Sequence, residues 1–345
     1  MSTEGSHFEF QQMGPMAVLG AGSWGTALAI HLHNSGRDVR LWGRSVDKIE
    51  SMRSTGLSPH YLPGVSLPQN MPLYSDIETC LEGVSDILVV VPSTDFAEVL
   101  HQIKSLVDQR DLRLAWATKG LDKVTHLPLS DVAAKIFSPS LPMAMLSGPS
   151  FAKEVAVGCL TAVSIAGNQT EWCQYLVQCF HSATFRAYLN DDFLGLQLCP
   201  VGKNVLAIAV GIVDGLELGA NTRAALITRG MAELQRLLKS LGADANTILS
   251  LAGVGDIVLT CTDNQSRNRR FGLALGSGLT IRQAEAEVGH EIEGRNNVRQ
   301  LHQLAAEHRV EMPIVQSMQA FLQGQVSLND LMAQLARRPA NTEFN

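Results

Sequence analysis

A glycine-rich turn between two apolar segments constrains the fold of this chain more than any other feature. The segment AVLGAGSWGTALA places Gly20, Gly22 and Gly25 in the spacing G-x-G-x-x-G, after a strand-like run and before a helix-like run. The first glycine of this pattern makes a tight turn, the second lets backbone approach a pyrophosphate, and the third lets helix and strand pack closely. The helix N-terminus supplies amide donors for the anion. The segment predicts a dinucleotide-binding unit; the alternative is a purely structural glycine turn.

Strand-like and helix-like segments alternate from residue 15 to about residue 190. The proline-rich segment HYLPGVSLPQNMP interrupts this pattern and is predicted to be a loop. Strands that alternate with helices form a parallel sheet covered by helices on both faces. The predicted strands are PMAVLG, DVRLWG, SDILVVVP, LRLAWATKG, PMAMLSGPS and TAVSIAG.

After about residue 192 the strand signals stop, and the remaining periodic segments are predicted to be helices. Asn221 or Thr222 is predicted to cap the helix RAALITRGMAELQRLLKSLG, and Gly242 to end it. We therefore expect an α/β domain of the Rossmann type, with a mostly parallel sheet, at 15–191, followed by an all-α domain at 192–345. Residues 1–14 are expected to form a disordered leader.

One row of residues in the segment PVGKNVLAIAVGIVDGLELG combines a cation with very small side chains. Steps of four from Lys203 reach Ala207, Gly211, Gly215 and Gly219, and residues four apart share one surface of a helix. Glycine weakens a helix interior by roughly 0.5–1 kcal/mol relative to alanine. The row therefore predicts a central helix that other helices approach closely, and the lysine raises the hypothesis of a buried amine whose proton matters.

Composition excludes several classes of function. The formal net charge of −6 argues against nucleic-acid binding by bulk charge. The six cysteines include no CxxC pair, so reduced thiols and a cytoplasmic location are expected. No metal-ligand constellation occurs, and no metal is expected. The opening residues lack the pattern of a signal peptide, and the uncharged stretch between Lys203 and Asp214 is far shorter than the ~20 residues of a membrane span.

The end of the second predicted strand bears on cofactor choice. An acidic residue that binds the adenosine ribose is expected about 20 residues after the glycine turn. The segment LWGRS holds Arg44 there and no acid. A guanidinium suits a 2′-phosphate, so the sequence favours NADP, alone or alongside NAD. The alternative is a solvated surface arginine.

Several polar residues follow predicted strands or begin helical segments. Lys119 ends WATKG, and Asp256 lies in AGVGDIVLTCT. The segment DNQSRNRRFG gathers Arg267, Arg269 and Arg270 within four residues. In an acidic protein such a cluster predicts a phosphate or carboxylate ligand; the alternative is a solvated loop.

Together these segments closely resemble the bacterial-type NAD(P)-dependent glycerol-3-phosphate dehydrogenases. The resemblance spans about residues 15–320 and rests on GAGSWGTALA, ATKGL, LSGPSFAKEVA, GKN, AGVGD, LTCTDNQSRNRRFG and IEGRNNV in this order. It implies reversible reduction of dihydroxyacetone phosphate to sn-glycerol 3-phosphate by hydride transfer to C2, which supplies phospholipid synthesis. It also implies a small-molecule phosphate substrate and a homodimer.

The resemblance assigns roles to three charged residues. Lys203 matches the proton donor and acceptor of the family, and Lys119 matches a second lysine near cofactor and substrate. Two ammonium groups in proximity, together with burial, lower the pKa of at least one of them. Asp256 is expected to orient Lys203 by a charge-assisted hydrogen bond; its alternative is a helix cap or turn residue. The alternative for both lysines is plain surface charge.

The resemblance also implies which other residues line the two ligands. Phe96 has core packing as its alternative, and Arg269 and Arg270 have a structural role as theirs. The expected substrate-side residues are Lys119, Gly148, Ser150, Lys203, Asp256, Ser266, Arg267 and Asn268. The expected cofactor-side residues are Gly20, Gly22, Ser23, Trp24, Gly25, Arg44, Phe96, Lys119, Ala152, Arg267, Ile292 and Glu293.

Two other functions remain open at this point. A related two-domain dehydrogenase could act on a 3-hydroxy acid or a ketopantoate-like substrate, although the arginine cluster and paired lysines favour a phosphate. A nucleotide-sensing protein could keep the fold without chemistry, although every expected polar position is filled.

Overall fold

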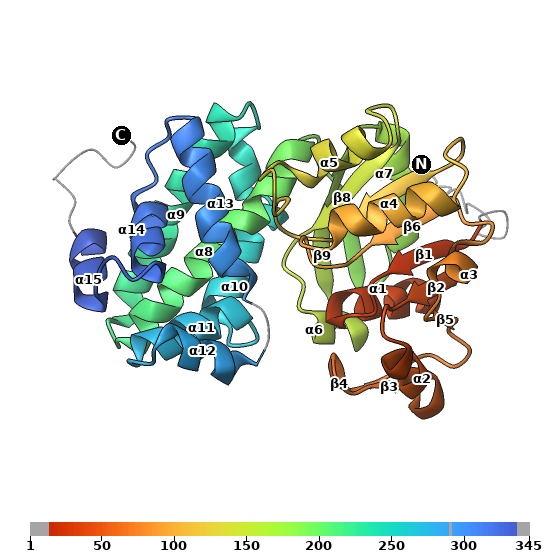
Figure 1. Ribbon diagram of the computed structural model, residues 1–345, viewed down its shortest axis with the longest axis horizontal. Coiled ribbons are helices and arrows are strands. Elements are labelled where there is room, and N and C mark those ends of the chain that lie inside the picture. The colour runs from red at the N-terminus through yellow and green to blue at the C-terminus, as the bar shows by residue number, and fades with distance from the viewer. Residues whose placement is uncertain (1–13, 290–291, 337–345) are drawn as a thin grey trace, which may run out of the picture. The chain divides into compact units, whose positions relative to one another are not determined.

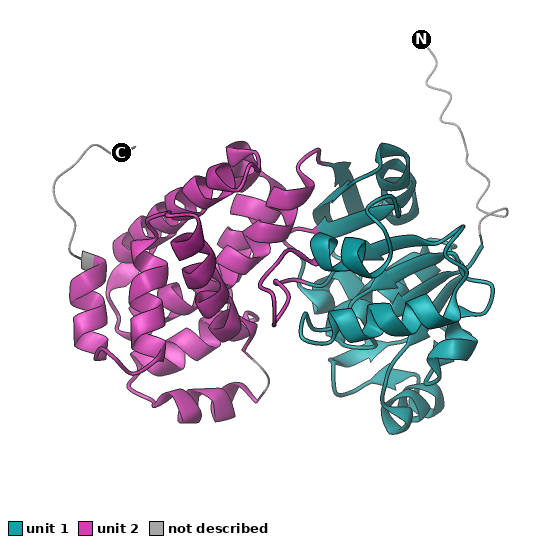
Figure 2. Ribbon diagram, turned by 45° about the horizontal axis from the view of Figure 1, so that its top comes forward, with its two compact units in different colours: residues 1–118, 130–146, 150–189 teal, residues 119–129, 147–149, 190–345 magenta. Residues whose placement is uncertain are grey.

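The computed structural model describes residues 14–289 and 292–336, and the chain divides into two compact units (Figure 2). The first unit comprises residues up to 118, 130–146 and 150–189, and the second comprises 119–129, 147–149 and the residues from 190 onward. Two short segments that follow strands of the first unit thus belong to the second. The predicted disordered leader lies outside the described residues, apart from Gly14.

An eight-stranded, mostly parallel sheet forms the first unit, as the alternating pattern predicts (Figure 1). The strand order is β10-β9-β8-β7-β6-β1-β2-β5. Strand β1 pairs in parallel with both β2 and β6, so the strand order reverses there. Open α/β sheets bind ligands beyond the carboxyl ends of their strands, at the point where the strand order reverses. The strands are β1 (Met16–Leu19), β2 (Val39–Trp42), β5 (Leu73–Tyr74), β6 (Asp86–Val89), β7 (Arg113–Trp116), β8 (Met143–Ser147), β9 (Thr161–Gly167) and β10 (Phe185–Leu189).

Five helices of this unit form two packed groups. Helix α1 packs with α6 and α7, whereas α3 packs with α4. Strands β1 and β6 are buried along their whole length, which explains their continuous apolar sequences. The helices are α1 (Ser23–Asn34), α2 (Val46–Thr55), α3 (Ile77–Leu81), α4 (Phe96–Leu106), α5 (Leu129–Ile136), α6 (Ala152–Ala156) and α7 (Thr170–Phe180).

The sequence-based prediction of strands was incomplete. Strand β10 was not predicted, because it lies at the sheet edge and only two of its five residues are buried. Strand β5 is only two residues long. The predicted proline-rich loop contains β4 (Leu62–Ser66), which pairs antiparallel with β3 (Leu57–Ser58). A two-stranded ribbon consists of edges, and an edge tolerates the missing N–H of Pro63.

The second unit is helical, as predicted, and surrounds one central helix. Helix α8 (Phe193–Gly215) packs against α9, α10, α11, α13 and α14 (Figure 1). By length and composition α8 could cross a membrane, but it is buried throughout the segment tested, as the core helix of a globular unit is. The other helices are α9 (Gly219–Ser240), α10 (Asp256–Thr262), α11 (Arg267–Gly276), α12 (Ile281–Val288), α13 (Glu293–Glu307), α14 (Pro313–Leu322) and α15 (Leu328–Ala336).

The segment KNVLAIAVGIVDGLELG predicts a helix over 203–219, and α8 differs from this prediction at both ends. It begins at Phe193, with Asp192 as its cap, so Lys203 lies in its middle rather than at its head. Pro200 lies inside the helix and resembles a helix boundary in sequence, because proline disfavours a helix interior. The helix ends at Gly215, and Gly219, with a φ of +87°, already belongs to α9.

The predicted cap of α9 was wrong, whereas its predicted end is confirmed. Helix α9 begins at Gly219 after Leu218, so Asn221 and Thr222 lie inside its first turn. Two short helical turns, Ala245–Leu249 and Leu251–Gly255, lead from α9 to α10. Gly242, with a φ of +80°, lies just after the end of α9 in the left-handed conformation that terminates helices.

The close helix approach predicted from the glycine row is confirmed for Gly211 and Gly215. A Cβ atom on Gly211 would overlap the carbonyl oxygen of Arg269 and lie 2.9 Å from Cα of Gly272. A Cβ atom on Gly215 would overlap the carbonyl oxygen of Leu273. Helix α11 therefore lies directly against the backbone of α8, and this contact requires glycine on both helices.

Candidate functional site

The three glycines of the turn between β1 and α1 have three different environments. Gly20 has a φ of +129°, and a Cβ atom there would overlap the carbonyl oxygen of Val90. A Cβ atom on Gly25 would overlap the carbonyl oxygen of Gly20. A Cβ atom on Gly22 would meet no described atom within 4 Å. The outer glycines thus close the turn, while the middle one leaves room for a ligand, which fits a dinucleotide pyrophosphate.

Two polar side chains flank this turn. Ser23 donates a hydrogen bond of 2.7 Å to the carbonyl oxygen of Tyr61. The indole nitrogen of Trp24 is buried and has no hydrogen-bond partner among the described residues. No side chain in the described part of the chain caps the N-terminus of α1. The amide groups of this terminus suit a phosphate ligand.

The other predicted cofactor residues of the first unit differ in exposure. Arg44 follows β2 with its side chain 80% exposed and its Nη1 atom 3.4 Å from Oδ2 of Asp95. Phe96 is fully buried and packs edge-on against Trp116, with ring centroids 5.6 Å apart. This geometry matches the core-packing alternative for the Phe96 ring. Ala152 begins α6 and is half-buried.

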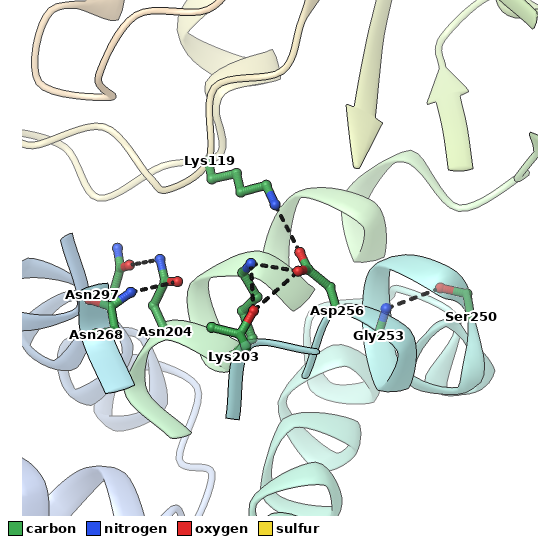
Figure 3. A network of polar contacts seen from close by, with 9 residues as sticks. Lys119, Lys203, Asn204, Ser250, Gly253, Asp256, Asn268 and Asn297 are labelled. Carbon is green, nitrogen blue, oxygen red and sulfur yellow. Dashed lines mark hydrogen bonds and ion pairs between the residues drawn. The ribbon is translucent and has the colours of Figure 1, made fainter. Parts of the chain in front are cut away.

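The second unit brings Lys119, Lys203 and Asp256 together (Figure 3). Lys203 donates from Nζ to Oδ1 of Asp256 at 2.7 Å, and Lys119 donates to Oδ2 of the same carboxylate at 2.9 Å. The side chains of Asp256, Lys203 and Lys119 are only 2%, 8% and 17% exposed. One buried carboxylate therefore holds two ammonium groups, which is the orientation predicted for Lys203.

Thr260 completes this cluster, and sequence reasoning missed it. Its Oγ1 atom lies 3.1 Å from Nζ of Lys203 and donates to Oδ1 of Asp256 at 3.2 Å. The signal was present in DIVLT, because residues four apart on a helix share a face. Lys203 is thus held by two oxygens from one face of α10.

The electrostatics of the cluster distinguish its two lysines. Burial lowers the pKa of Lys203 to about 8; the charge of Lys119 acts in the same direction, and Asp256 opposes it. Burial also acts to lower the pKa of Lys119, but the charge and hydrogen bond of Asp256 outweigh it and raise that pKa. Burial alone would raise the pKa of Asp256, but the two lysines lower it. Lys203 therefore releases its proton most readily.

The predicted arginine cluster separates on α11. Arg269 is buried, forms an ion pair with Asp214 and donates to the carbonyl oxygen of Cys261 at 3.0 Å. This geometry matches its structural alternative. Arg267 and Arg270 remain exposed, and Nη2 of Arg267 lies 3.9 Å from Oε1 of Glu293.

The neighbours of Arg267 are more constrained. Ser266 caps α11 by accepting a hydrogen bond from the amide of Arg269 at 3.2 Å. Asn268 is buried and accepts from the amide of Gly294 at 3.0 Å. The start of α11 therefore presents an exposed guanidinium beside a buried, hydrogen-bonded amide.

The last predicted residues lie on loops and helix starts. Gly148 is buried in the segment 147–149 of the second unit, whose Pro149 would lie 3.4 Å from a Cβ atom on Gly255. Ser150 belongs to the first unit. Ile292 is buried before the first turn of α13, which Glu293 begins. Among residues 14–289 and 292–336 no group of three His, Cys, Asp or Glu side chains could hold a metal ion.

Comparison with known proteins places this geometry in a family context. The model of the NAD-dependent glycerol-3-phosphate dehydrogenase N-terminus matches residues 15–173, and the model of its C-terminus matches residues 192–333. A glycerol-3-phosphate dehydrogenase [NAD(P)+] of Coxiella burnetii is 47% identical over 329 residues, which cover 95% of this chain and 98% of that protein. One of Legionella pneumophila is 46% identical over 328 residues, with the same coverage.

Solved structures agree. The crystal structure of glycerol-3-phosphate dehydrogenase from Coxiella burnetii matches with a TM-score of 0.90 at 47% identity, and covers 94% of this chain and 99% of that one. Matches of this extent include both the glycine turn and the lysine–aspartate cluster. The chain belongs to the NAD-dependent glycerol-3-phosphate dehydrogenase family.

Proposed function

We propose that this protein is an NAD(P)-dependent sn-glycerol-3-phosphate dehydrogenase. It reversibly reduces dihydroxyacetone phosphate to sn-glycerol 3-phosphate and supplies phospholipid synthesis. The observation that carries this proposal is the buried Asp256 carboxylate that holds Lys203 and Lys119, in a chain of this family. Such a cluster provides a fixed proton donor, which the reduction of a ketone needs, beside a fixed positive charge, which stabilises the oxyanion that develops.

Lys203 is the acid and base of the proposed reaction. The nicotinamide, when bound, supplies or accepts the hydride at C2 of the substrate. During reduction negative charge builds on the C2 oxygen, and protonated Lys203 donates its proton to that oxygen. During oxidation neutral Lys203 accepts the hydroxyl proton. A pKa of about 8 suits both directions, because a general acid–base group works best when its pKa lies near the operating pH.

Lys119 and Asp256 support this proton transfer in different ways. Lys119 keeps its ammonium form because its pKa is raised, so it stabilises the oxyanion by charge. Preorganised charges of this kind are effective because they need no reorientation during the reaction. Asp256 and Thr260 fix the Nζ atom of Lys203 through two oxygens of α10.

We assign the substrate phosphate to the start of α11. Arg267 has an exposed guanidinium next to the buried Asn268. A guanidinium can donate two parallel hydrogen bonds to two oxygens of one phosphate. Ser266 adds a hydroxyl group at the N-terminus of the same helix, where the helix dipole favours anions. Gly148 and Ser150 form a wall of the substrate site in this proposal.

We assign the dinucleotide to the glycine turn. The open side of Gly22 accommodates the pyrophosphate, and Gly20 and Gly25 shape the turn around it. Arg44 binds a 2′-phosphate, so NADP(H) is used alongside or in preference to NAD(H). The proposed cofactor site also includes Ser23, Trp24, Phe96 through its backbone, Ala152, Lys119, Arg267, Ile292 and Glu293.

We further propose a cytoplasmic homodimer. The six described cysteines are free thiols, as expected in a reducing compartment. Sedimentation equilibrium of the purified protein tests the dimer directly. A mass equal to that of one chain across the accessible concentrations would exclude it.

A spectrophotometric assay tests the function. NADPH or NADH oxidation is followed with dihydroxyacetone phosphate, with unphosphorylated dihydroxyacetone and with ketopantoate. We expect activity with the phosphate compound only. Activity with ketopantoate or a 3-oxo acid would support the hydroxy-acid alternative instead. Cofactor binding without turnover of any substrate would support the nucleotide-sensing alternative.

A further inference from the structure

Four buried amide side chains of the second unit form a continuous chain of hydrogen bonds. Asn268 donates to Asn204 at 2.9 Å, Asn204 donates to Asn297 at 2.8 Å, and Figure 3 shows both contacts. Asn297 then donates to Oε1 of Gln300 at 3.0 Å. We call Asn268, Asn204, Asn297 and Gln300 the amide chain. It joins α11, α8 and α13 through four buried residues.

Backbone groups at both ends fix the direction of the amide chain. At one end the amide of Gly294, which can only donate, contacts Oδ1 of Asn268 at 3.0 Å. At the other end Nε2 of Gln300 donates to the carbonyl oxygens of Leu121 and Asp122, which can only accept, at 3.1 Å each. Reversing any one amide would oppose two oxygens or two NH₂ groups. The four amides therefore have one consistent orientation.

The far end of the amide chain holds the loop that carries Lys119. Gln300 binds the carbonyl groups two and three residues after Lys119. The same loop is tightened by Asp122, whose Oδ2 atom accepts from the amides of Val124 and Thr125 at 3.0 and 2.7 Å. Gln300 thus fixes a short, stiff loop rather than a flexible one.

The first two members of the amide chain, Asn268 and Asn204, are sequence neighbours of other site residues. Asn204 directly follows Lys203 on α8, and Asn268 directly follows Arg267 on α11. Leaving a buried amide without a hydrogen-bond partner costs about 1–3 kcal/mol of stability. Each hydrogen bond of the amide chain therefore favours the positions of the neighbouring amides. The amide chain therefore connects the backbones of Lys119, Lys203 and Arg267 through hydrogen bonds that do not involve their side chains.

We propose that Gln300 and Asn297 are positioning residues of the reaction, which hold the Lys119 loop so that Lys119 and Lys203 share the Asp256 carboxylate. This inference rests on the proposed function. Among the hydrogen bonds described for Gln300 and Asn297, none goes to either lysine side chain. Their role is to fix the distance between the two backbones from which those side chains extend.

Loss of this link has a specific electrostatic consequence. The charged groups that act on the cluster are Lys119 from the loop, Asp256 from α10 and Glu293 from α13. The nearby Cys261 thiol stays neutral, because burial raises its pKa to about 12. If Lys119 moves away, Lys203 loses the cation that lowers its pKa. It then no longer shares the Asp256 carboxylate with a second ammonium group. The pKa of Lys203 then rises.

Gln300→Met tests the proposal, because methionine fills a similar space but has no N–H to donate to the carbonyl oxygens of Leu121 and Asp122. The matched control is Gln303→Met on the same helix, where Gln303 is exposed and bonds only Glu307 among the contacts described for its side chain. We expect kcat of Gln300→Met to fall about 10- to 100-fold, since small misplacements of catalytic groups have effects of this size. The midpoint of the kcat pH profile rises.

A second variant and a second readout separate positioning from loss of folding. Asn297→Leu breaks another link, so the double variant should be no slower than the slower single variant. Amide hydrogen exchange at 119–129 should accelerate in both variants and not in Gln303→Met. This measurement needs no turnover, so it tests the amide chain even if the wild type proves inactive and the proposed function fails. A pH midpoint, kcat and exchange rate in Gln300→Met equal to those of Gln303→Met would overturn the inference.

Discussion

The Nζ atom of Lys203 lies 2.7 Å from Oδ1 of Asp256, and both side chains are buried in the helical unit. Burial favours the neutral amine of Lys203, whereas the carboxylate of Asp256 favours its ammonium form. The charge of Lys119 acts in the same direction as burial and lowers the pKa of Lys203 further. The result is a lysine whose proton can move near neutral pH. The proposed reaction depends on this balance more than on any single contact.

The two directions of the reaction should therefore depend on pH in opposite ways. Reduction needs the ammonium form of Lys203, so kcat for reduction should fall as pH rises through about 8. Oxidation needs the neutral amine, so kcat for oxidation should rise through the same pH. Initial rates at saturating substrate, measured in both directions on either side of this value, check the prediction. Profiles that change in the same direction would contradict it.

Removing the proton donor should cost activity rather than folding. Lys203→Ala should lower kcat by at least about 10²-fold, the lower end of the effect of a general acid. The matched control is Lys239→Ala, since Lys239 is exposed in the last turn of α9. Steady-state kinetics and circular dichroism of both variants give the answer. Near-wild-type kcat in a folded Lys203→Ala would remove Lys203 from the mechanism.

Arg44 should decide between the two cofactors. If its guanidinium binds a 2′-phosphate, Arg44→Ala should lower kcat/KM for NADPH by about 10-fold or more, as loss of a charge-assisted contact does, and spare NADH. Arg110→Ala is the control, because Arg110 is similarly exposed and pairs with Asp108. An unchanged ratio of kcat/KM for the two cofactors would mean that Arg44 is the solvated surface residue of the alternative interpretation.

Local patterns sufficed for the shape of the glycine turn, whereas the pairing of Lys119 with Lys203 was expected from the family resemblance. The functions of Gly20, Gly22 and Gly25 depend on their immediate chain neighbours, so spacing reveals them. Gln300 could not be found this way, because its carbonyl partners lie 178 and 179 residues away in sequence. Only the fold brings them together.

The arginine cluster shows a second limit. Arg267, Arg269 and Arg270 are near neighbours in sequence, but each residue of a helix points about 100° away from the one before it. Arg269 consequently points into the fold towards Asp214, while Arg267 and Arg270 stay exposed. Composition predicts the cluster, and the burial of α11 against α8 decides which members can bind a ligand.

The contact between α8 and α11 should be intolerant of a single methyl group. In Gly211→Ala the new Cβ would overlap the backbone of α11 at Arg269, and overpacking of this kind costs about 1–3 kcal/mol. Gly14→Ala is the control, since a Cβ there meets no described atom within 4 Å. Urea denaturation should show a lower free energy of unfolding for Gly211→Ala only. Equal stability of the two variants would mean that α8 and α11 can separate without loss.

Glu233 should make stability depend on pH. Its buried carboxylate accepts from the amide of Ile314 at 2.9 Å and so caps α14. Burial raises its pKa from 4.5 to about 7, although the amides of α14, Arg236 and Arg229 act in the opposite direction. An acid whose pKa is raised on folding is stabilising below its unfolded value, and this contribution is lost as pH rises through the folded value. The wild type should therefore lose on the order of 3 kcal/mol between these two pH values.

Glu233→Gln keeps an oxygen for the amide of Ile314 but does not titrate. The free energy of unfolding of this variant should lack the decline. Above about pH 7 the variant should therefore be more stable relative to the wild type than it is at low pH. Glu287→Gln, at an exposed position on α12, should follow the wild-type curve. Denaturation midpoints measured across this pH range decide the matter. If Glu233→Gln declines as steeply as the wild type, the carboxylate is already ionised in the folded protein and the α14 cap is an ion–amide contact at every pH tested.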